Sequence, residues 1–195
     1  MALAVPWDGA ADHAAWLASA NYLVPLVAVT RDGGEGRTTM TRAGRVRIDY
    51  RLDATGIATL RHALGSMARI ARAAGAVEIL AAATPIVRHD ARGDDEAGRF
   101  DAFLARLARL DFAPNRAAVF SAHQMGTVRM GADAADHPAD ARGRVRGPDG
   151  AIVPGLYVAD SSTFPTGIGV NPMLAVMTMA RRVARTIKAE GRPPG

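Results

Sequence analysis

Two stretches near the C-terminal end carry residue types that enzymes use for proton transfer and for binding anionic groups. The first, HQMGTVRMG, places His123 between a predicted strand and a glycine-containing turn. Imidazole changes charge near neutral pH and is therefore the usual base for removing a proton from a hydroxyl group. The second, TGIGVNPML, predicts a helix start with Asn171 as the N-cap and Pro172 at the first helical position.

Each stretch also has a plainer interpretation. A histidine that follows a strand often has a structural role, and Asn-Pro is a common start for an ordinary surface helix. A helix that begins here leaves the N–H groups of Met173 and Leu174 free to donate, and its partial positive charge suits an anionic ligand. The residue types alone do not bring His123 and Asn171 together, so both interpretations stay open at this point.

Hydrophobic periodicity predicts the elements that must position these residues. The strand at 44–52 alternates polar with apolar residues and is expected to be half-buried. Gly75 is expected to cap the C-terminal end of the helix at 53–75. We predict strands at 21–32, 44–52, 76–80, 117–122 and 155–160, helices at 53–75 and 171–188, a helix with Phe100, Phe103, Leu104 and Leu107 on one face, a glycine-rich hairpin turn at 32–36, and loops at 88–98 and 131–155.

Composition excludes several classes of protein. The chain has 195 residues, enough for one domain or two small lobes, and its formal charge is +5. Lys188 is its only lysine, and the arginines form no basic run with interleaved aromatics, which argues against nucleic-acid binding. Cysteine is absent, so disulfides and thiolate chemistry are excluded. The start resembles no signal peptide and no apolar run is long enough for a membrane span, so we expect a cytoplasmic protein.

The other titratable residues have simpler interpretations. The sequence places His89 near three aspartates, but their spacing matches no metal-ligand pattern, so no metal site is predicted and a solvated, helix-capping loop is expected. We expect surface or capping roles for His13 and His62, and no functional role for His137. Asp136, Asp140 and Asp149 are expected to form turns.

Two long motifs in order, HQMGTVRMG and GLYVADSSTFPTGIGVNPMLAVMTMARRVA, resemble the C-terminal signature of the glucose–methanol–choline (GMC) family of flavin alcohol oxidoreductases. The resemblance covers about the last 75 residues strongly and the preceding elements more weakly. It implies an α+β or α/β fold class. The expected architecture is an antiparallel-sheet piece of the substrate domain at 1–120, then a catalytic, flavin-contacting segment at 121–195 whose strand and long helix return to the flavin domain.

The resemblance also implies a cofactor, FAD, and a role for each matching residue. His123 falls on the family's catalytic base, and Asn171 on its partner position, which holds the substrate oxygen. Asp160 falls on a residue near the ribityl–pyrophosphate part of the flavin. Pro172 and Met173 fall on backbone that meets the pyrimidine edge of the isoalloxazine ring. The implied reaction oxidises the CH–OH group of a small-molecule alcohol to an aldehyde or ketone, with hydride transfer to the flavin.

One feature of the family is missing from the sequence. Members bind the ADP half of FAD with a G-x-G-x-x-G motif on a βαβ unit, and no such motif occurs here. We therefore expect the chain to carry only the C-terminal half of the machinery and to need an N-terminal FAD-binding half from the same gene or a separate chain. The alternative is a truncated or split-gene orphan domain without activity by itself.

Overall fold

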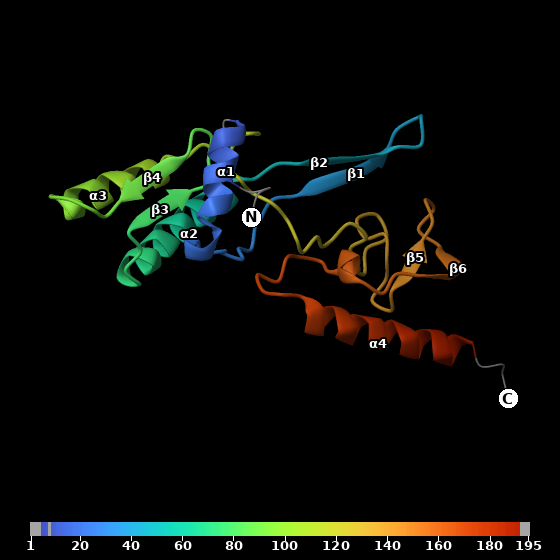
Figure 1. Ribbon diagram of the computed structural model, residues 1–195. Helices are drawn as coiled ribbons and strands as arrows, with labels where there is room; N and C mark the ends of the chain where they lie inside the picture. Colours follow the sequence, from blue (N-terminus) through green and yellow to red (C-terminus); the bar gives the residue numbers. More distant parts are fainter. Residues whose placement is uncertain (1–4, 8, 192–195) are drawn as a thin grey trace. The chain divides into compact units, whose positions relative to one another are not determined.

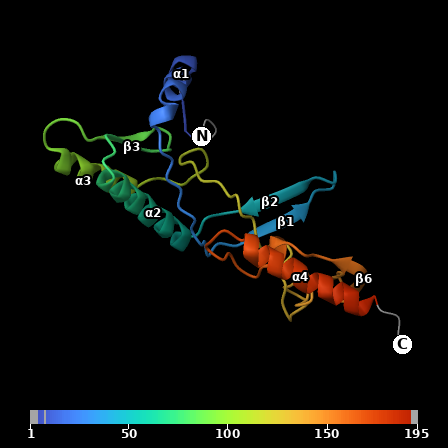
Figure 2. The same ribbon diagram turned by 60° about the horizontal axis from the view of Figure 1, so that its bottom comes forward.

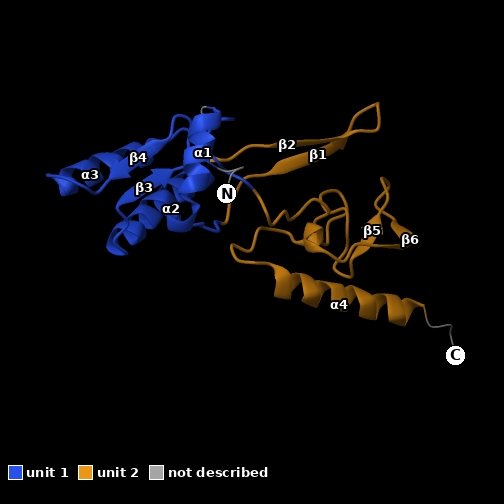
Figure 3. Cartoon of the chain, viewed as in Figure 1, with its two compact units in different colours: residues 1–30, 54–120 blue, residues 31–53, 121–195 orange. Residues whose placement is uncertain are grey.

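The computed structural model describes residues 5–7 and 9–191 (Figure 1). Within these residues the chain forms four α-helices and three two-stranded antiparallel sheets. It divides into two compact units, one made of residues 1–30 and 54–120 and the other of residues 31–53 and 121–195 (Figure 3). The mixed helix and antiparallel-sheet composition confirms the predicted fold class, whereas the division into 1–120 and 121–195 as domains stays a prediction.

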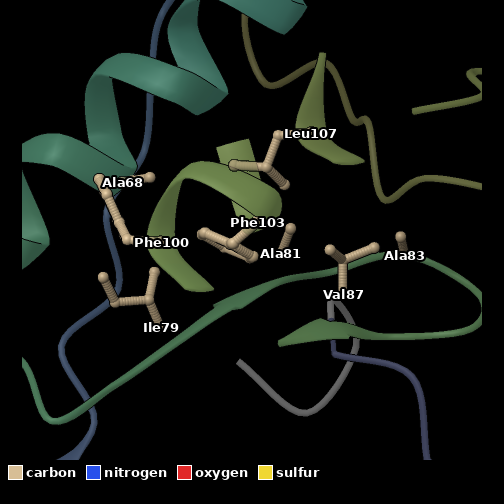
Figure 4. Close-up of a cluster of buried hydrophobic side chains, with 8 residues drawn as sticks. All are labelled: Ala68, Ile79, Ala81, Ala83, Val87, Phe100, Phe103 and Leu107. Carbon is tan, nitrogen blue, oxygen red and sulfur yellow. The ribbon is translucent and has the colours of Figure 1, made fainter. Parts of the chain in front are cut away.

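The first unit packs helices against one short β-hairpin. Its elements are α1 (Ala10–Ala18), the 3-10 helix η1 (Ala20–Tyr22), α2 (Ala54–Ala73), β3 (Glu78–Ala81), β4 (Val87–Asp90) and α3 (Glu96–Leu107). Figure 4 shows the buried cluster that α2, α3 and the hairpin share. The cluster consists of Ala68, Ile79, Ala81, Ala83, Val87, Phe100, Phe103 and Leu107.

The predicted glycine cap of α2 is confirmed. Gly75 adopts a φ of +82°, a left-handed conformation that glycine accepts without a steric penalty. Its N–H donates to the carbonyl of Arg72, and the N–H of Ala76 donates to the carbonyl of Ala71. These two bonds form the motif that satisfies the last carbonyls of a helix.

The prediction of a solvated loop around His89 is wrong. Residues 87–90 form β4, and His89 is only 3% exposed, packed beside the rings of Phe100 and Phe103. Its Nε2 lies 3.0 Å from Glu96 Oε1, at the start of α3. The charged neighbours hid a strand in which alternate residues point inward, whereas the capping role expected of this loop is confirmed by Asp95, which accepts from the N–H of Gly98.

The second unit contains a hairpin, a second small sheet and the long C-terminal helix. Its elements are β1 (Gly36–Met40), β2 (Val46–Tyr50), β5 (Arg144–Arg146), β6 (Ile152–Tyr157), the 3-10 helix η2 (Ser161–Thr163) and α4 (Met173–Glu190). The views in Figures 1 and 2 agree that β1 and β2 run side by side as an extended ribbon. None of the described helices is both long enough and apolar enough to cross a bilayer.

The β1–β2 hairpin and the segment before it differ from the predictions. The strand predicted at 21–32 does not form, and β1 begins only at Gly36. The turn lies between Thr41 and Arg45 instead of at 32–36. The glycines have another purpose: a Cβ on Gly34 would lie 2.9 Å from the Arg51 carbonyl oxygen, so the incoming chain passes very close to the end of β2.

β2 is a strand as predicted, but it is not half-buried. All of its residues, and all of those in β1, are exposed within the described part of the chain. Met40, Val46, Ile48 and Tyr50 share one face of the ribbon, because Met40 pairs with Val46 and side chains alternate between faces. The alternating sequence is therefore that of a strand with an apolar face, and in this unit that face is open.

α4 docks through one deeply buried residue. Val183 is 1% exposed, and its Cγ2 lies 2.5 Å from the position that a Cβ on Gly143 would occupy. Gly143 adopts a φ of +79°, so this close approach requires glycine twice over. At the C-terminal end of α4, Glu190 pairs with Arg144 at 3.3 Å and accepts a hydrogen bond from Tyr157.

Two further boundaries differ from prediction. The strand expected at 117–122 does not form. Within the described residues it is represented by a bridge between Ala117 and Ala83 and a hydrogen bond from the N–H of Ala118 to the carbonyl of Ala82. The loop expected at 131–155 contains β5 and the start of β6. Within it, Asp140 and Asp149 form turns as predicted, each accepting a backbone N–H two residues ahead.

Candidate functional site

His123 lies on an exposed segment without regular secondary structure. The residues that follow it are nevertheless fixed, because three of their N–H groups donate to the three carbonyl oxygens of η2. The bonds run from Gly126 to Ser161 at 3.3 Å, from Val128 to Ser162 at 2.9 Å and from Met130 to Thr163 at 3.0 Å. The structure therefore joins the histidine motif to the segment that contains Asp160, although the two are more than 30 residues apart in sequence.

Asp160 caps the 3-10 helix that receives these bonds. Its Oδ1 accepts from the N–H of Ser162 at 2.8 Å and from the Ser162 hydroxyl at 2.5 Å. A carboxylate in this position satisfies donors that a helix start leaves unbonded. Asp160 thus shapes the turn that holds the histidine segment, and its predicted role near the cofactor stays a prediction.

The start of α4 lies one to two residues later than predicted. The helix begins at Met173, and Pro172 rather than Asn171 stands in the cap position. The first helical bond runs from the N–H of Val176 to the carbonyl of Pro172 at 2.8 Å. Because Pro172 has a φ of −85° and a ψ of −1°, close to helical values, the difference concerns where the first helical turn is counted.

The helix start is open to a ligand. Asn171 is exposed, Met173 is 65% exposed and Leu174 is 74% exposed. The first N–H groups of an α-helix point forward without intrahelical partners and carry partial positive charge. This donor set fits the oxygen-rich, electron-accepting edge of a flavin ring, which is the part of FAD that the resemblance assigns to Pro172 and Met173.

The glycine-rich loop that leads into this helix contacts the segment just before the β1–β2 hairpin. Arg31 Nη2 donates to Thr166 Oγ1 at 3.2 Å, and a Cβ on Gly169 would lie 3.3 Å from the Cβ of Arg31. Gly169 also adopts a φ of +73°. Asp32, next to Arg31, accepts from the hydroxyl of Tyr50, and burial followed by this hydrogen bond raises the pKa of the tyrosine. The glycine-rich loop is thereby tied to the hairpin.

The predicted site residues are only partly brought together. His123 and Asp160 belong to segments joined by hydrogen bonds, and Asn171, Pro172 and Met173 are consecutive. Within the described residues, however, no hydrogen bond joins His123 to Asn171. A hollow of about 390 Å³ lies on the hairpin and is lined by Glu35, Gly36, Arg37, Ile48, Asp49, Tyr50 and Arg51, none of which is a predicted site residue.

No metal centre accompanies these residues in the part of the chain that the structure describes. There, no group of three or more His, Asp or Glu side chains is placed to hold an ion. The side chains and backbone of the two motifs offer acid–base and hydrogen-bonding chemistry. An exposed imidazole, an exposed amide and an open helix start can accept a proton, orient an oxygen atom and face a group that takes up negative charge.

Arg146 is an important residue that the sequence did not single out. Its guanidinium donates to the carbonyl oxygens of Gly131, Ala132, His137 and Ala139, at 2.8 to 3.3 Å. It thereby closes the loop that follows the histidine motif. No sequence signal could have identified it, because its partners are backbone carbonyls, which every residue type has.

His137 has a structural role in the same loop. Its Nδ1 lies 3.0 Å from the Asp133 carbonyl, and its ring occupies the space where Gly131 would carry a side chain. The Met-Gly turn at the end of the histidine motif is thus explained by packing. Only glycine fits against this ring.

Comparison with known proteins matches the chain to one family over most of its length. The family described as GMC oxidoreductase matches residues 35–180. A GMC-type oxidoreductase of Mycobacterium tuberculosis is 34% identical over 171 residues, covering 87% of this chain and 24% of the relative. A long-chain-alcohol oxidase of Arabidopsis thaliana is 30% identical over 182 residues, covering 90% of this chain and 23% of the relative.

A shorter match falls on choline oxidase of Arthrobacter globiformis. It is 43% identical over 68 residues, which is 34% of this chain and 12% of that enzyme. The chain therefore spans about a quarter of the length of the longer-matching relatives.

Proposed function

The chain belongs to the GMC oxidoreductase family, and from this premise we propose that it is the C-terminal catalytic portion of an FAD-dependent oxidoreductase that acts on the CH–OH group of alcohols. The observation that carries the proposal is the hydrogen-bonded junction between the His123 segment and the turn capped by Asp160. This junction joins the two motifs that the resemblance assigns to proton removal and to the cofactor.

Each residue has a defined part in the proposed reaction. Bound FAD supplies the acceptor for the hydride that leaves the alcohol carbon. His123 removes the hydroxyl proton, and a positioned base of this kind contributes roughly a hundred- to ten-thousand-fold in rate. Asn171 donates its amide N–H to the substrate oxygen and keeps that oxygen in line with the base.

The backbone at the start of α4 supports the same reaction electrostatically. Its unpaired N–H groups favour negative charge at the facing ring edge by about 0.3–1 kcal/mol, and by up to ~2 kcal/mol where the group is partly buried. The exposure of Met173 and Leu174 is consistent with a ligand or a polypeptide covering them. We propose that the FAD-binding half of the enzyme provides both.

The experiment that tests this function replaces the base in the FAD-loaded enzyme. His123→Ala is expected to lower kcat by at least about a hundredfold while flavin content stays unchanged. His62→Ala is the matched control, because His62 lies in α2 of the first unit, whereas every predicted site residue belongs to the second unit. Turnover of His123→Ala close to that of the parent enzyme would remove His123 from the mechanism.

The second candidate is an orphan domain that has no activity by itself. It is favoured by the exposure of both His123 and Asn171, since a working base and its partner need a site from which water is excluded. Titration of the purified chain with FAD tests the orphan-domain candidate. Stoichiometric flavin binding counts against the orphan domain, and no bound flavin at saturating FAD favours it.

A further inference from the structure

Ser161 grips the chain on the C-terminal side of His123 with two of its groups. Its hydroxyl donates to the carbonyl oxygen of Gln124 at 2.9 Å, and its own carbonyl accepts from the N–H of Gly126 at 3.3 Å. Both ends of the three-residue stretch that follows the histidine are therefore bound to a single residue of η2.

A third hydrogen bond closes the backbone around the histidine. The side chain of Gln124 donates from Nε2 to the Ser121 carbonyl at 2.6 Å, so residues 121–124 form a small loop with His123 inside it. Ser161 is the residue that anchors this loop to the rest of the unit, because it binds the backbone carbonyl of Gln124 itself.

The junction is held at close range and in a defined geometry. Gly126 adopts a φ of +80°, and a Cβ placed on it would lie 3.3 Å from the carbonyl oxygen of Phe164. The segment can approach η2 this closely because it carries glycine at this position.

The neighbouring serine provides a contrast within the same short helix. Ser162 also has a hydroxyl that donates a hydrogen bond, but its acceptor is Asp160 Oδ1 and not the histidine segment. The two hydroxyls thus have different targets, one on the side of the proposed base and the other on the side of the capping carboxylate.

We infer that Ser161 is a positioning residue for His123: its hydroxyl fixes the loop from which the imidazole reaches the alcohol. This inference rests on the proposed function, in which His123 is the base. A general base must come within about 2.6–3.2 Å of the group from which it takes the proton, and a misplacement of about 1 Å can cost on the order of a hundredfold in rate. Ser161 acts through His123 and touches no substrate in this account.

The first readout needs no cofactor and uses the 195-residue chain itself. Ser161→Ala removes the hydroxyl bond to the Gln124 carbonyl but keeps the Ser161 carbonyl that accepts from Gly126. Because the segment is then held by one hydrogen bond fewer, hydrogen exchange at the amide of Gly126 is expected to be about three- to tenfold faster. In Ser162→Ala the same amide should exchange within about twofold of the parent rate. Equal exchange at Gly126 in the parent and in Ser161→Ala would overturn the inference.

The second readout is the division of the effect between kcat and KM in the FAD-loaded enzyme. Ser161→Ala is expected to lower kcat about three- to tenfold with KM unchanged, and Ser161→Thr, which keeps the hydroxyl, should recover the lost rate. A loss of equal size in Ser162→Ala, or no recovery in Ser161→Thr, would show a general effect on the fold and overturn the inference.

The two proposals fail in different ways. If His123→Ala lowers kcat by a hundredfold but Ser161→Ala changes neither kcat nor the exchange of Gly126, the inference about Ser161 fails alone. If His123→Ala keeps full turnover, the proposed function fails, while the exchange measurement still reports whether Ser161 holds the segment.

Discussion

At the scale of single residues, His123 and Asn171 have unequal roles in the proposed reaction. There the imidazole takes a proton, whereas the amide only orients the oxygen that loses it. Both side chains are exposed in the described part of the chain, and neither is committed to a hydrogen bond in its own unit. Their substitution therefore reports on the reaction more than on the fold.

Asn171→Ala should lower kcat in the FAD-loaded enzyme by roughly three- to tenfold, the effect of one neutral hydrogen bond. The loss should be smaller than that caused by His123→Ala. Asn21→Ala, at an exposed asparagine of the first unit, serves as the control and should leave kcat unchanged. If Asn171→Ala costs as much as His123→Ala or more, the roles of the two residues are reversed.

At the scale of elements, α2, β4 and α3 share an ion-paired cluster beside the core of the first unit. Glu96 binds Arg72 from α2 and lies 3.0 Å from His89 of β4, and the Arg72 guanidinium lies 4.5 Å from the centre of the Phe100 ring. The hydrogen bond from Arg72, followed by that from His89, holds the pKa of Glu96 below its ordinary value of 4.5. Ionised Glu96 thus contributes to holding the three elements together.

This cluster predicts a pH dependence of stability. A carboxyl group whose pKa is lowered on folding stabilises the folded state above its unfolded pKa, and that stabilisation is lost as the pH falls through the folded pKa. The free energy of unfolding of the first unit should therefore decrease as the pH falls below about 4.5. Arg72→Gln should weaken this pH dependence, measured by urea unfolding at a series of pH values between about 3 and 6. Arg69→Gln, on the same helix, should leave the pH dependence unchanged. If the free energy of unfolding depends on pH equally in the parent and in both variants, the assignment is contradicted.

The attachment of α4 to β5 and β6 gives a second prediction. Val183→Ala should lower the free energy of unfolding by about 2 kcal/mol, because it leaves a cavity against Gly143. Leu174→Ala, on the exposed side of the same helix, should change it by less than about 0.5 kcal/mol. Thermal or urea unfolding measures both, and similar losses in the two variants would mean that α4 is buried on another face.

The elements show why sequence predicted some features and not others. Periodicity identified α2, α3 and α4, since a helix repeats its apolar face within the segment itself. It failed for 21–32 and 117–122, where a strand depends on a pairing partner that sequence does not specify, and for β4, whose charged letters concealed buried positions. The motifs predicted the site residues, and that prediction stays untested, whereas the bonds from Ser161 and Arg146 to backbone carbonyls have no sequence signature.

At the scale of the whole molecule, several large apolar side chains are exposed within the described residues. They include Leu174 and Met177 on α4 and Met40, Val46 and Ile48 on the β1–β2 hairpin, all at least 60% exposed. Apolar surface of this kind is typical of an interface. In the proposed function, an FAD-binding half would cover these side chains.

The purified chain should therefore self-associate in a concentration-dependent manner. The double variant Leu174→Glu/Met177→Glu should shift it towards the monomer in size-exclusion chromatography with light scattering. Ala184→Glu adds one negative charge at an exposed position of α4 and should have little effect. A parent chain that elutes as a monomer at every concentration would show that this surface does not drive association.

The central claim is that His123 removes the proton when the alcohol is oxidised. The most direct test mixes the FAD-loaded enzyme anaerobically with a primary alcohol and follows the loss of flavin absorbance in a single turnover. The account predicts that His123→Ala slows this step by at least about a hundredfold, whereas His62→Ala leaves it unchanged. A His123→Ala enzyme that is reduced at the parent rate would contradict the account.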